Sequence, residues 1–165
     1  MSRAILFPGQ GSQNVGMGKD LYDNFPVAKA VFEEVDDTLS QKLSAIIFDG
    51  PVEDLTLTAN TQPALMAVSI AAMRVLQEEK GISVANAACV AGHSLGEYAA
   101  LCAAGSLSLS DTAKLLRIRG EAMQNAVPVG QGAMAALIGA TIETCLLYTS
   151  PSPRDQRGSR MPSSA

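Results

Sequence analysis

The sequence predicts an α/β fold in which helices flank a parallel sheet. Two short apolar segments, residues 4–7 and 87–91, each end at a proline or a glycine and have the length of buried strands. The segments between and after them carry apolar residues at helical spacing. Strands that alternate with helices in this order are typical of a parallel sheet covered by helices.

The first half of the chain is predicted to be mainly helical. The strand at residues 4–7 leads into a loop of small residues at 9–13, and helical periodicity follows over residues 17–25. A second helix begins at Pro26, where proline is well tolerated. Its predicted apolar face consists of Val27, Ala30, Val31 and Val35.

A short helix and a long helix precede the second strand. Residues 51–55 begin with proline and carry acidic residues in the first turn, as helix starts often do. Asn60 is predicted to be the N-cap of a long helix that ends near Glu79, with Pro63 tolerated in its first turn. Gly81 is the predicted stop.

After the strand at 87–91, a helix is predicted from about Ser94 to Ala104. The next helix opens at Ser110 and is broken at Val127–Pro128, where proline cannot continue it. Its apolar residues are Leu115, Leu116, Ile118 and Met123. The apolar run within residues 132–139 is predicted to be a further strand.

Composition indicates one cytoplasmic domain. The chain has 165 residues, 47% of them hydrophobic, which suffices for a globular core. A net charge of −4 argues against nucleic acid or an anionic membrane as partner. No apolar run has the length of a signal peptide or a membrane span. Cys89, Cys102 and Cys145 lack metal-ligand spacing; the first two are predicted to be buried, and the odd count fits a reducing compartment.

The last 22 residues, 144–165, differ from the rest of the chain. They hold three arginines and one acidic residue among many serines and prolines, which is typical of a solvated tail. Residues 145–155 also resemble translated sequencing-adapter sequence. We therefore expect the native sequence to stop near Glu143 and the tail to be disordered or foreign, without function.

The segment 92–96, Gly-His-Ser-Leu-Gly, places Ser94 directly between a predicted strand and a predicted helix. A serine in such a tight turn needs neighbours without side chains, because the backbones crowd there. The N–H groups at the start of the helix then point toward a developing oxyanion. The motif predicts an activated serine, with an ordinary tight turn as the alternative.

Other segments accompany this motif in a fixed order. FPGQGSQ at residues 7–13 precedes GHSLGE at 92–97, and further segments are NTQPA at 60–64, Arg119-Gly120, AVP at 126–128 and GAMAA at 132–136. Together they resemble the malonyl-CoA:acyl carrier protein transacylase family, which includes the acyltransferase domains of polyketide and fatty acid synthases. The resemblance extends from Ser2 to about Ile142.

This resemblance implies a role for five residues. Ser94 would take malonyl from the coenzyme A thioester as an ester and pass it to the phosphopantetheine thiol of acyl carrier protein. The backbone N–H groups of Gln10 and Leu95 would form the oxyanion hole. Arg119 would bind the free malonyl carboxylate, and Gln10 and His93 would also contact the substrate. Malonyl-CoA is then a substrate, and neither a bound cofactor nor a metal is implied.

The catalytic base is the missing part. His93 is the single histidine, but a residue before the serine of such a turn points elsewhere, so we predict a packing or substrate-wall role for it. In the family the base is a histidine from the second half of the chain, and this sequence offers no candidate. We therefore expect the chain alone to be nearly inactive. Arg117, about 200° around the helix from Arg119, is predicted to lie at the surface.

The resemblance also implies the domain organisation. Residues 1–130 would belong to a large α/β hydrolase-like subdomain, residues 131–143 would begin a ferredoxin-like small subdomain, and 144–165 would be the tail. The whole enzyme is expected to be a monomer that serves fatty acid biosynthesis, with malonyl-CoA and acyl carrier protein as partners and neither nucleic acid nor a membrane. The start at Met1 favours a free enzyme rather than part of a synthase.

Two other functions remain open from the residues. A serine esterase or lipase would also place Ser94 at such a turn, but it gives no reason for Arg119. A non-catalytic module that binds acyl-CoA or a carrier protein would fit the missing base. The sequence leaves open whether malonyl or methylmalonyl is preferred.

Overall fold

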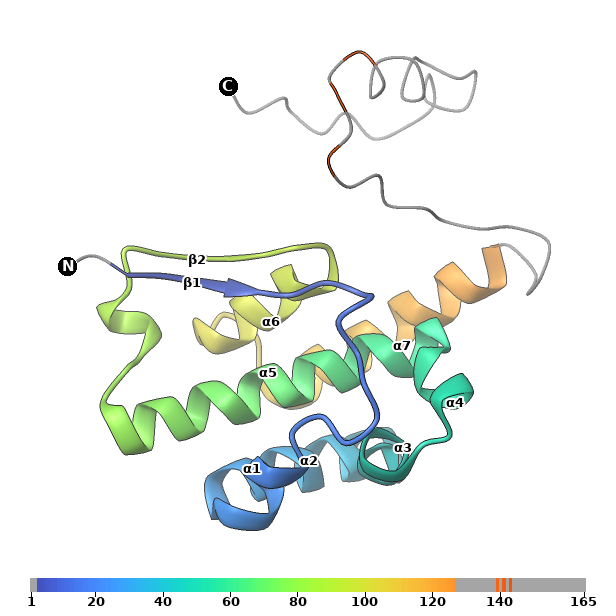
Figure 1. Cartoon of the computed structure of the whole chain (residues 1–165), viewed down its shortest axis with the longest axis horizontal. Coiled ribbons are helices and arrows are strands. Elements are labelled where there is room, and N and C mark those ends of the chain that lie inside the picture. Colours follow the sequence, from blue (N-terminus) through green and yellow to red (C-terminus); the bar gives the residue numbers. More distant parts are fainter. Residues whose placement is uncertain (1–2, 127–138, 140, 142, 144–165) are drawn as a thin grey trace. The chain divides into compact units, whose positions relative to one another are not determined.

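The computed structural model describes residues 3–126, Gly139, Thr141 and Glu143. The chain divides into two units, Met1–Gln131 and Gly132–Ala165, and the structure below is that of the first. Its elements (Figure 1) are β1 (Ala4–Phe7), α1 (Lys19–Asn24), α2 (Pro26–Leu39), α3 (Leu43–Asp49), α4 (Val52–Thr56), α5 (Thr58–Lys80), the short 3-10 helix η1 (Val84–Asn86), β2 (Cys89–Gly92), α6 (Leu95–Ala103) and α7 (Leu109–Ala126).

The two strands confirm the predicted fold class. Strands β1 and β2 pair in parallel, with Ala4 opposite Cys89 and Phe7 opposite Gly92. They can run parallel because five α-helices and the short 3-10 helix η1 lie between them in the chain and return it to the same end of the sheet. The C-terminal ends of both strands therefore lie at the same edge of the sheet. At this edge, the loop after Phe7 meets the turn that contains Ser94.

Helix α5 is the centre of the core. It runs below the sheet in Figure 1 and packs against α2, α6 and α7. The largest side chains of this core are completely removed from solvent, and their burial is the main favourable term in folding. They include Phe32, Leu43, Ile47, Leu55, Met66, Leu95 and Leu116.

Helices α5 and α7 cross with their backbones in close contact at Gly120. A Cβ atom at Gly120 would lie 2.7 Å from the Cα of Ala59 and 2.7 Å from the carbonyl oxygen of Thr58. Because these are backbone atoms, no side-chain rotation can make room for it. The absence of a side chain at this position therefore sets the distance between the two helices.

The beginning of α5 differs from the prediction, whereas its end confirms it. The helix begins at Thr58, and the side chain of Asn60 is buried and donates from Nδ2 to the carbonyl oxygen of Asp54 at 2.9 Å. The predicted N-cap is wrong because this amide bonds to another helix rather than to N–H groups of its own first turn. Gly81 ends the helix at φ 62°, and its N–H donates to the carbonyl oxygen of Gln77.

Smaller differences concern α2 and α7. Ala30 is exposed, so its predicted place on the apolar face is wrong, and Ala28 is buried instead. The buried face of α2 consists of Ala28, Val31, Phe32, Val35 and Asp36. Helix α7 begins at Leu109, one residue before the predicted start, because the Ser108 hydroxyl caps it by accepting the N–H of Asp111 at 3.0 Å.

The second strand is less buried than predicted. Cys89 and Ala91 are exposed and alternate with partly buried residues, and Leu6 of β1 is 73% exposed. This alternation is that of a sheet covered on one face only. The prediction of a buried Cys89 is therefore wrong, and Cys102 is half-buried rather than buried.

Three sequence predictions concern residues that the structure does not describe. They are the strand within 132–139, the break of the last helix at 127–128 and the nature of the tail at 144–165. Among the described residues, no helix combines the length and the apolar character needed to cross a membrane.

We predict that Gly120→Ala destabilises the chain by about 2 kcal/mol, because the added methyl group meets backbone atoms of α5. The loss should appear although alanine favours helix by about 1 kcal/mol over glycine. Urea denaturation measures it, and Lys114→Ala on the exposed side of α7 is the control, with a change within about 0.5 kcal/mol. An unchanged or higher stability of Gly120→Ala would contradict the proposed close crossing.

Candidate active site

Ser94 occupies a strained turn between β2 and α6. Its backbone has φ 55° and ψ −111°, a conformation that is costly for any residue with a Cβ atom and that clusters at functional sites. The two glycines of the motif make room for it. A Cβ atom at Gly92 would lie 1.9 Å from the carbonyl carbon of Gly96, and one at Gly96 would lie 2.4 Å from the carbonyl oxygen of Phe7. The strand–turn–helix context predicted for the motif is present.

Two backbone N–H groups at this edge are available to an external acceptor. Leu95 is the first residue of α6, so its N–H has no acceptor within the helix. The following N–H groups, those of Gly96 and Glu97, are satisfied within the turn. The N–H of Gln10, in the turn after β1, has no recorded acceptor within residues 3–126. Within residues 3–126, the N–H groups of Gln10 and Leu95 are thus free to donate to a substrate.

Arg119 reaches Ser94 from helix α7. Its Nη2 donates to the Ser94 Oγ at 3.0 Å, and its Nη1 donates to Oε1 of Gln62 at 2.5 Å. The guanidinium carbon also lies 5.8 Å from the centre of the Tyr98 ring, close enough for a cation–π interaction. The structure therefore brings together two of the residues that the sequence analysis singled out, one from α7 and one from the β2–α6 turn.

Gln62 is a site residue for which the sequence analysis assigned no role. Its side chain is fully buried on α5, and its Nε2 donates to the sulfur of Met123 at 3.3 Å while Oε1 accepts from Arg119. Its only sequence signal was a polar residue in the segment 60–64. Buried amides need partners, so this residue type at this place indicated a contact but not which one.

The loop after β1 is tied to the same end of α5. The Nε2 of Gln10 donates to the hydroxyl of Thr58 at 3.3 Å, and the N–H of Gly11 donates to Oε1 of Gln13 at 2.8 Å. Thr58 is the first residue of α5. The Gln10 loop and Arg119 are therefore both held by the first turns of one helix.

His93 faces the loop after β1. It is exposed, and its Nδ1 would be 2.3 Å from a Cβ atom at Gly9, so the ring lies against the backbone of that loop. Among the described residues, Arg119 is the only one whose side chain has a recorded hydrogen bond to the Ser94 hydroxyl. A packing or substrate-wall role for His93 stays a prediction.

Arg117 is not at the surface, so that prediction is wrong. It is half-buried, its Nη1 donates to Oδ1 of Asn60 at 2.8 Å, and its Nη2 donates to Oε1 of Gln41. Burial lowers the pKa of the Arg117 guanidinium, and the nearby Glu121 acts in the opposite direction.

The position of the contact between α5 and α7 explains why both arginines form hydrogen bonds to α5. The contact is centred between Leu116 and Gly120, which are buried on one side of α7. At about 100° per residue, Arg117 and Arg119 each lie about 80° from that centre, on opposite sides of it. Both therefore flank the contact, and each reaches one polar residue of the first turns of α5.

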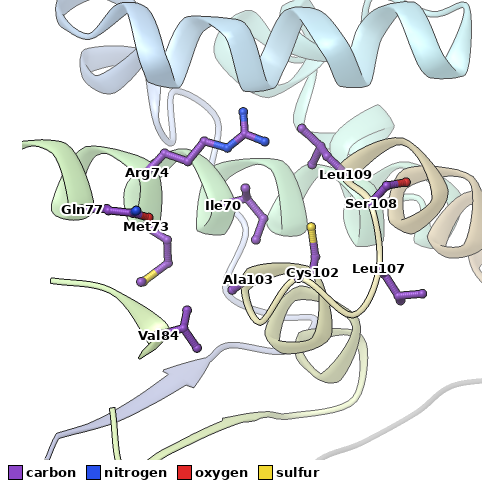
Figure 2. Close-up of a pocket in the computed structure, with 11 residues that line it drawn as sticks. Ile70, Met73, Arg74, Gln77, Val84, Cys102, Ala103, Leu107, Ser108 and Leu109 are labelled. Atoms are coloured by element: carbon purple, nitrogen blue, oxygen red, sulfur yellow. The ribbon is translucent and has the colours of Figure 1, made fainter. Parts of the chain in front are cut away.

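A separate pocket of about 440 Å³ lies at the far end of α6 (Figure 2). Arg74 and Gln77 of α5 line it together with Cys102 and the loop before α7. Burial is the main cause that raises the pKa of the Cys102 thiol. Ser94 precedes the first residue of α6 and does not line this pocket. Within the part of the chain that the structure describes, no group of three or more potential ligands is placed to hold a metal ion.

The chain is similar to several known proteins. The malonyl CoA-acyl carrier protein transacylase of Bacillus subtilis strain 168 is 55% identical over 140 residues, which are 85% of this chain and 43% of that protein. The crystal structure of the acyl-carrier-protein S-malonyltransferase from Bartonella henselae is 64% identical, with a TM-score of 0.81 over 87% of this chain and 46% of that one.

A second similar structure contains a partner. It is a type II PKS acyl carrier protein in complex with its malonyl-transacylase, which is 46% identical with a TM-score of 0.72 and is matched over 78% of this chain and 40% of its own. The chain thus spans less than half the length of these relatives. Residues 5–152 match the acyl transferase domain family. Because this match covers most of the chain and includes the turn at Ser94, the chain belongs to the acyl transferase domain family.

Proposed function

We propose that the chain is part of an [acyl-carrier-protein] S-malonyltransferase that serves fatty acid biosynthesis. The observation that carries the proposal is the 3.0 Å hydrogen bond from Arg119 to the hydroxyl of Ser94. An arginine beside a nucleophile suits an acyl group that ends in a free carboxylate, because the planar guanidinium binds a carboxylate through two parallel hydrogen bonds. The names of the similar proteins, which are malonyl transacylases, support the same substrate.

In the first half-reaction, the Ser94 Oγ attacks the thioester carbonyl of malonyl-CoA. The carbon–sulfur bond breaks, coenzyme A leaves as the thiol, and malonyl stays on Ser94 as an ester. The N–H groups of Gln10 and Leu95 would donate to the carbonyl oxygen while it carries negative charge. Arg119 would exchange its bond to the hydroxyl for the malonyl carboxylate, which is one methylene away from the ester carbonyl.

In the second half-reaction, the phosphopantetheine thiol of acyl carrier protein attacks the ester and releases Ser94. The complex of a carrier protein with a similar transacylase supports this partner. Both halves need a base for the attacking hydroxyl or thiol. The family resemblance assigns this role to a histidine in a part of the longer relatives that the chain does not match, and His93 packs against Gly9 instead.

We infer the remaining features of the proposed enzyme from its composition and from the family resemblance. It would act in the cytoplasm as a monomer, without a bound cofactor, on malonyl-CoA and a carrier protein. Residues 1–130 would belong to the large subdomain and residues 131–143 to the start of the small one, with 144–165 as a tail without function.

We predict that incubation with malonyl-CoA adds the mass of one malonyl group to the chain and none to Ser94→Ala. Intact-mass spectrometry measures the adduct, and Ser83→Ala is the control that keeps it. Because no side chain within residues 3–126 is hydrogen-bonded to Ser94 as a base, acylation should be about 10²- to 10⁴-fold slower than in a full-length relative.

Other outcomes would decide between the alternatives. An adduct that persists in Ser94→Ala would contradict the proposed nucleophile. Hydrolysis of simple esters without a malonyl adduct would indicate an esterase, and binding of malonyl-CoA without any adduct would indicate a binding module. Transfer to carrier protein as fast as in a full-length relative would contradict the expected lack of a base.

We predict that Arg119→Ala reduces the preference of Ser94 for malonyl over acetyl. A hydrogen bond to a charged group contributes about 1.5–3 kcal/mol, so the ratio of the two acylation rates should fall roughly ten- to hundredfold. The two rates are followed by mass with malonyl-CoA and acetyl-CoA. Arg74→Ala, which removes a half-buried arginine of α5 remote from Ser94, is the control. An unchanged ratio in Arg119→Ala would remove Arg119 from the proposed substrate site.

A further inference from the structure

We infer that Gln62 is a positioning residue that sets the acyl specificity of the site: its buried amide oxygen orients the Arg119 guanidinium toward Ser94 without neutralising its charge. The inference rests on the proposed function, because it concerns how an acyl group with a free carboxylate is chosen.

The hydrogen bonds of Gln62 determine which way its amide points. A guanidinium group only donates, so the atom 2.5 Å from Nη1 of Arg119 must be the amide oxygen. The amide nitrogen then faces the sulfur of Met123, 3.3 Å away, which is a weak acceptor. Both partners lie on α7, and Gln62 is completely buried on α5. The amide is therefore held at both ends and offers Arg119 one fixed acceptor.

The amide oxygen of Gln62 binds one nitrogen of the guanidinium, and the other nitrogen points toward Ser94. With Nη1 bound to Gln62, Nη2 lies 3.0 Å from the Ser94 hydroxyl. The long arginine side chain has much rotamer freedom to lose, and a buried, preset acceptor removes much of that cost before the substrate arrives. Among the hydrogen bonds of residues 3–126, none joins Gln62 to Ser94, so Gln62 acts through Arg119.

The neutrality of Gln62 is as important as its position. A carboxylate at the same place would pair with Arg119 and compete with the carboxylate of the acyl group. Within residues 3–126, no carboxylate lies within salt-bridge distance of Arg119. The Tyr98 ring, 5.8 Å from the guanidinium carbon, attracts the cation without cancelling its charge. Arg119 is therefore oriented by neutral groups only and keeps its full charge for an anionic acyl group.

The test is a competition between malonyl-CoA and acetyl-CoA in one tube, read as the ratio of the two Ser94 adducts by intact mass. This ratio does not depend on how much of each variant is folded. We expect Gln62→Glu to shift the ratio toward acetyl by roughly tenfold or more, because the introduced carboxylate pairs with Arg119. Gln62→Met, which has a similar volume and no strong acceptor, should shift it in the same direction. Gln77→Glu, the same change at an exposed site of α5, should leave it unchanged.

Each other outcome overturns a defined part of the inference. A wild-type preference for malonyl that persists in Gln62→Glu overturns the role of Gln62 and leaves the proposed function intact. A wild-type chain without preference for malonyl overturns the proposed function and this inference with it. Loss of both adducts in Gln62→Glu and in Gln62→Met would show a purely structural role and would also overturn the inference.

Discussion

The close crossing of α5 and α7 determines where the polar groups of the site lie. Because Gly120 has no side chain, the first turns of α5 come within reach of the arginines on either side of the contact. Arg119 then spans from Gln62 to Ser94 through hydrogen bonds of 2.5 and 3.0 Å, and Arg117 is anchored on the opposite flank. A small shift of either helix would break these hydrogen bonds. The position of Arg119 beside Ser94 therefore depends on helix packing as much as on the motif around the serine.

Features that depend on neighbouring residues in the chain could be predicted from the sequence. The strand at 4–7, the turn at Ser94 and the helix stop at Gly81 each carry their signal within a few positions. The physical reason given for the glycines on either side of Ser94 also agrees with the structure, because a Cβ atom at Gly92 or at Gly96 would overlap backbone atoms. Local sterics decide these features, and local sterics can be seen in the sequence.

Features that depend on which elements touch could not be predicted in this way. Periodicity gives the angle between Arg117 and Arg119 but not the direction from which α5 approaches, so it wrongly predicts Arg117 to lie at the surface. Asn60 is a residue type that often caps helices, yet its side-chain amide donates a hydrogen bond to a neighbouring helix. Gln62 has a function in our proposal only because Met123 and Arg119 face it. The exposure of Cys89 likewise depends on what covers the sheet.

The backbone at Ser94 bears on how such a chain would evolve. The cost of φ 55° and ψ −111° belongs to the Cβ atom and not to the hydroxyl, so replacing serine by alanine would remove the proposed nucleophile but keep the strain. Glycine alone relieves it. A lineage that no longer needed the reaction would therefore gain stability by drifting to glycine at this position. Under our proposal, the need for the hydroxyl group of Ser94 is what would keep a strained serine in place of glycine.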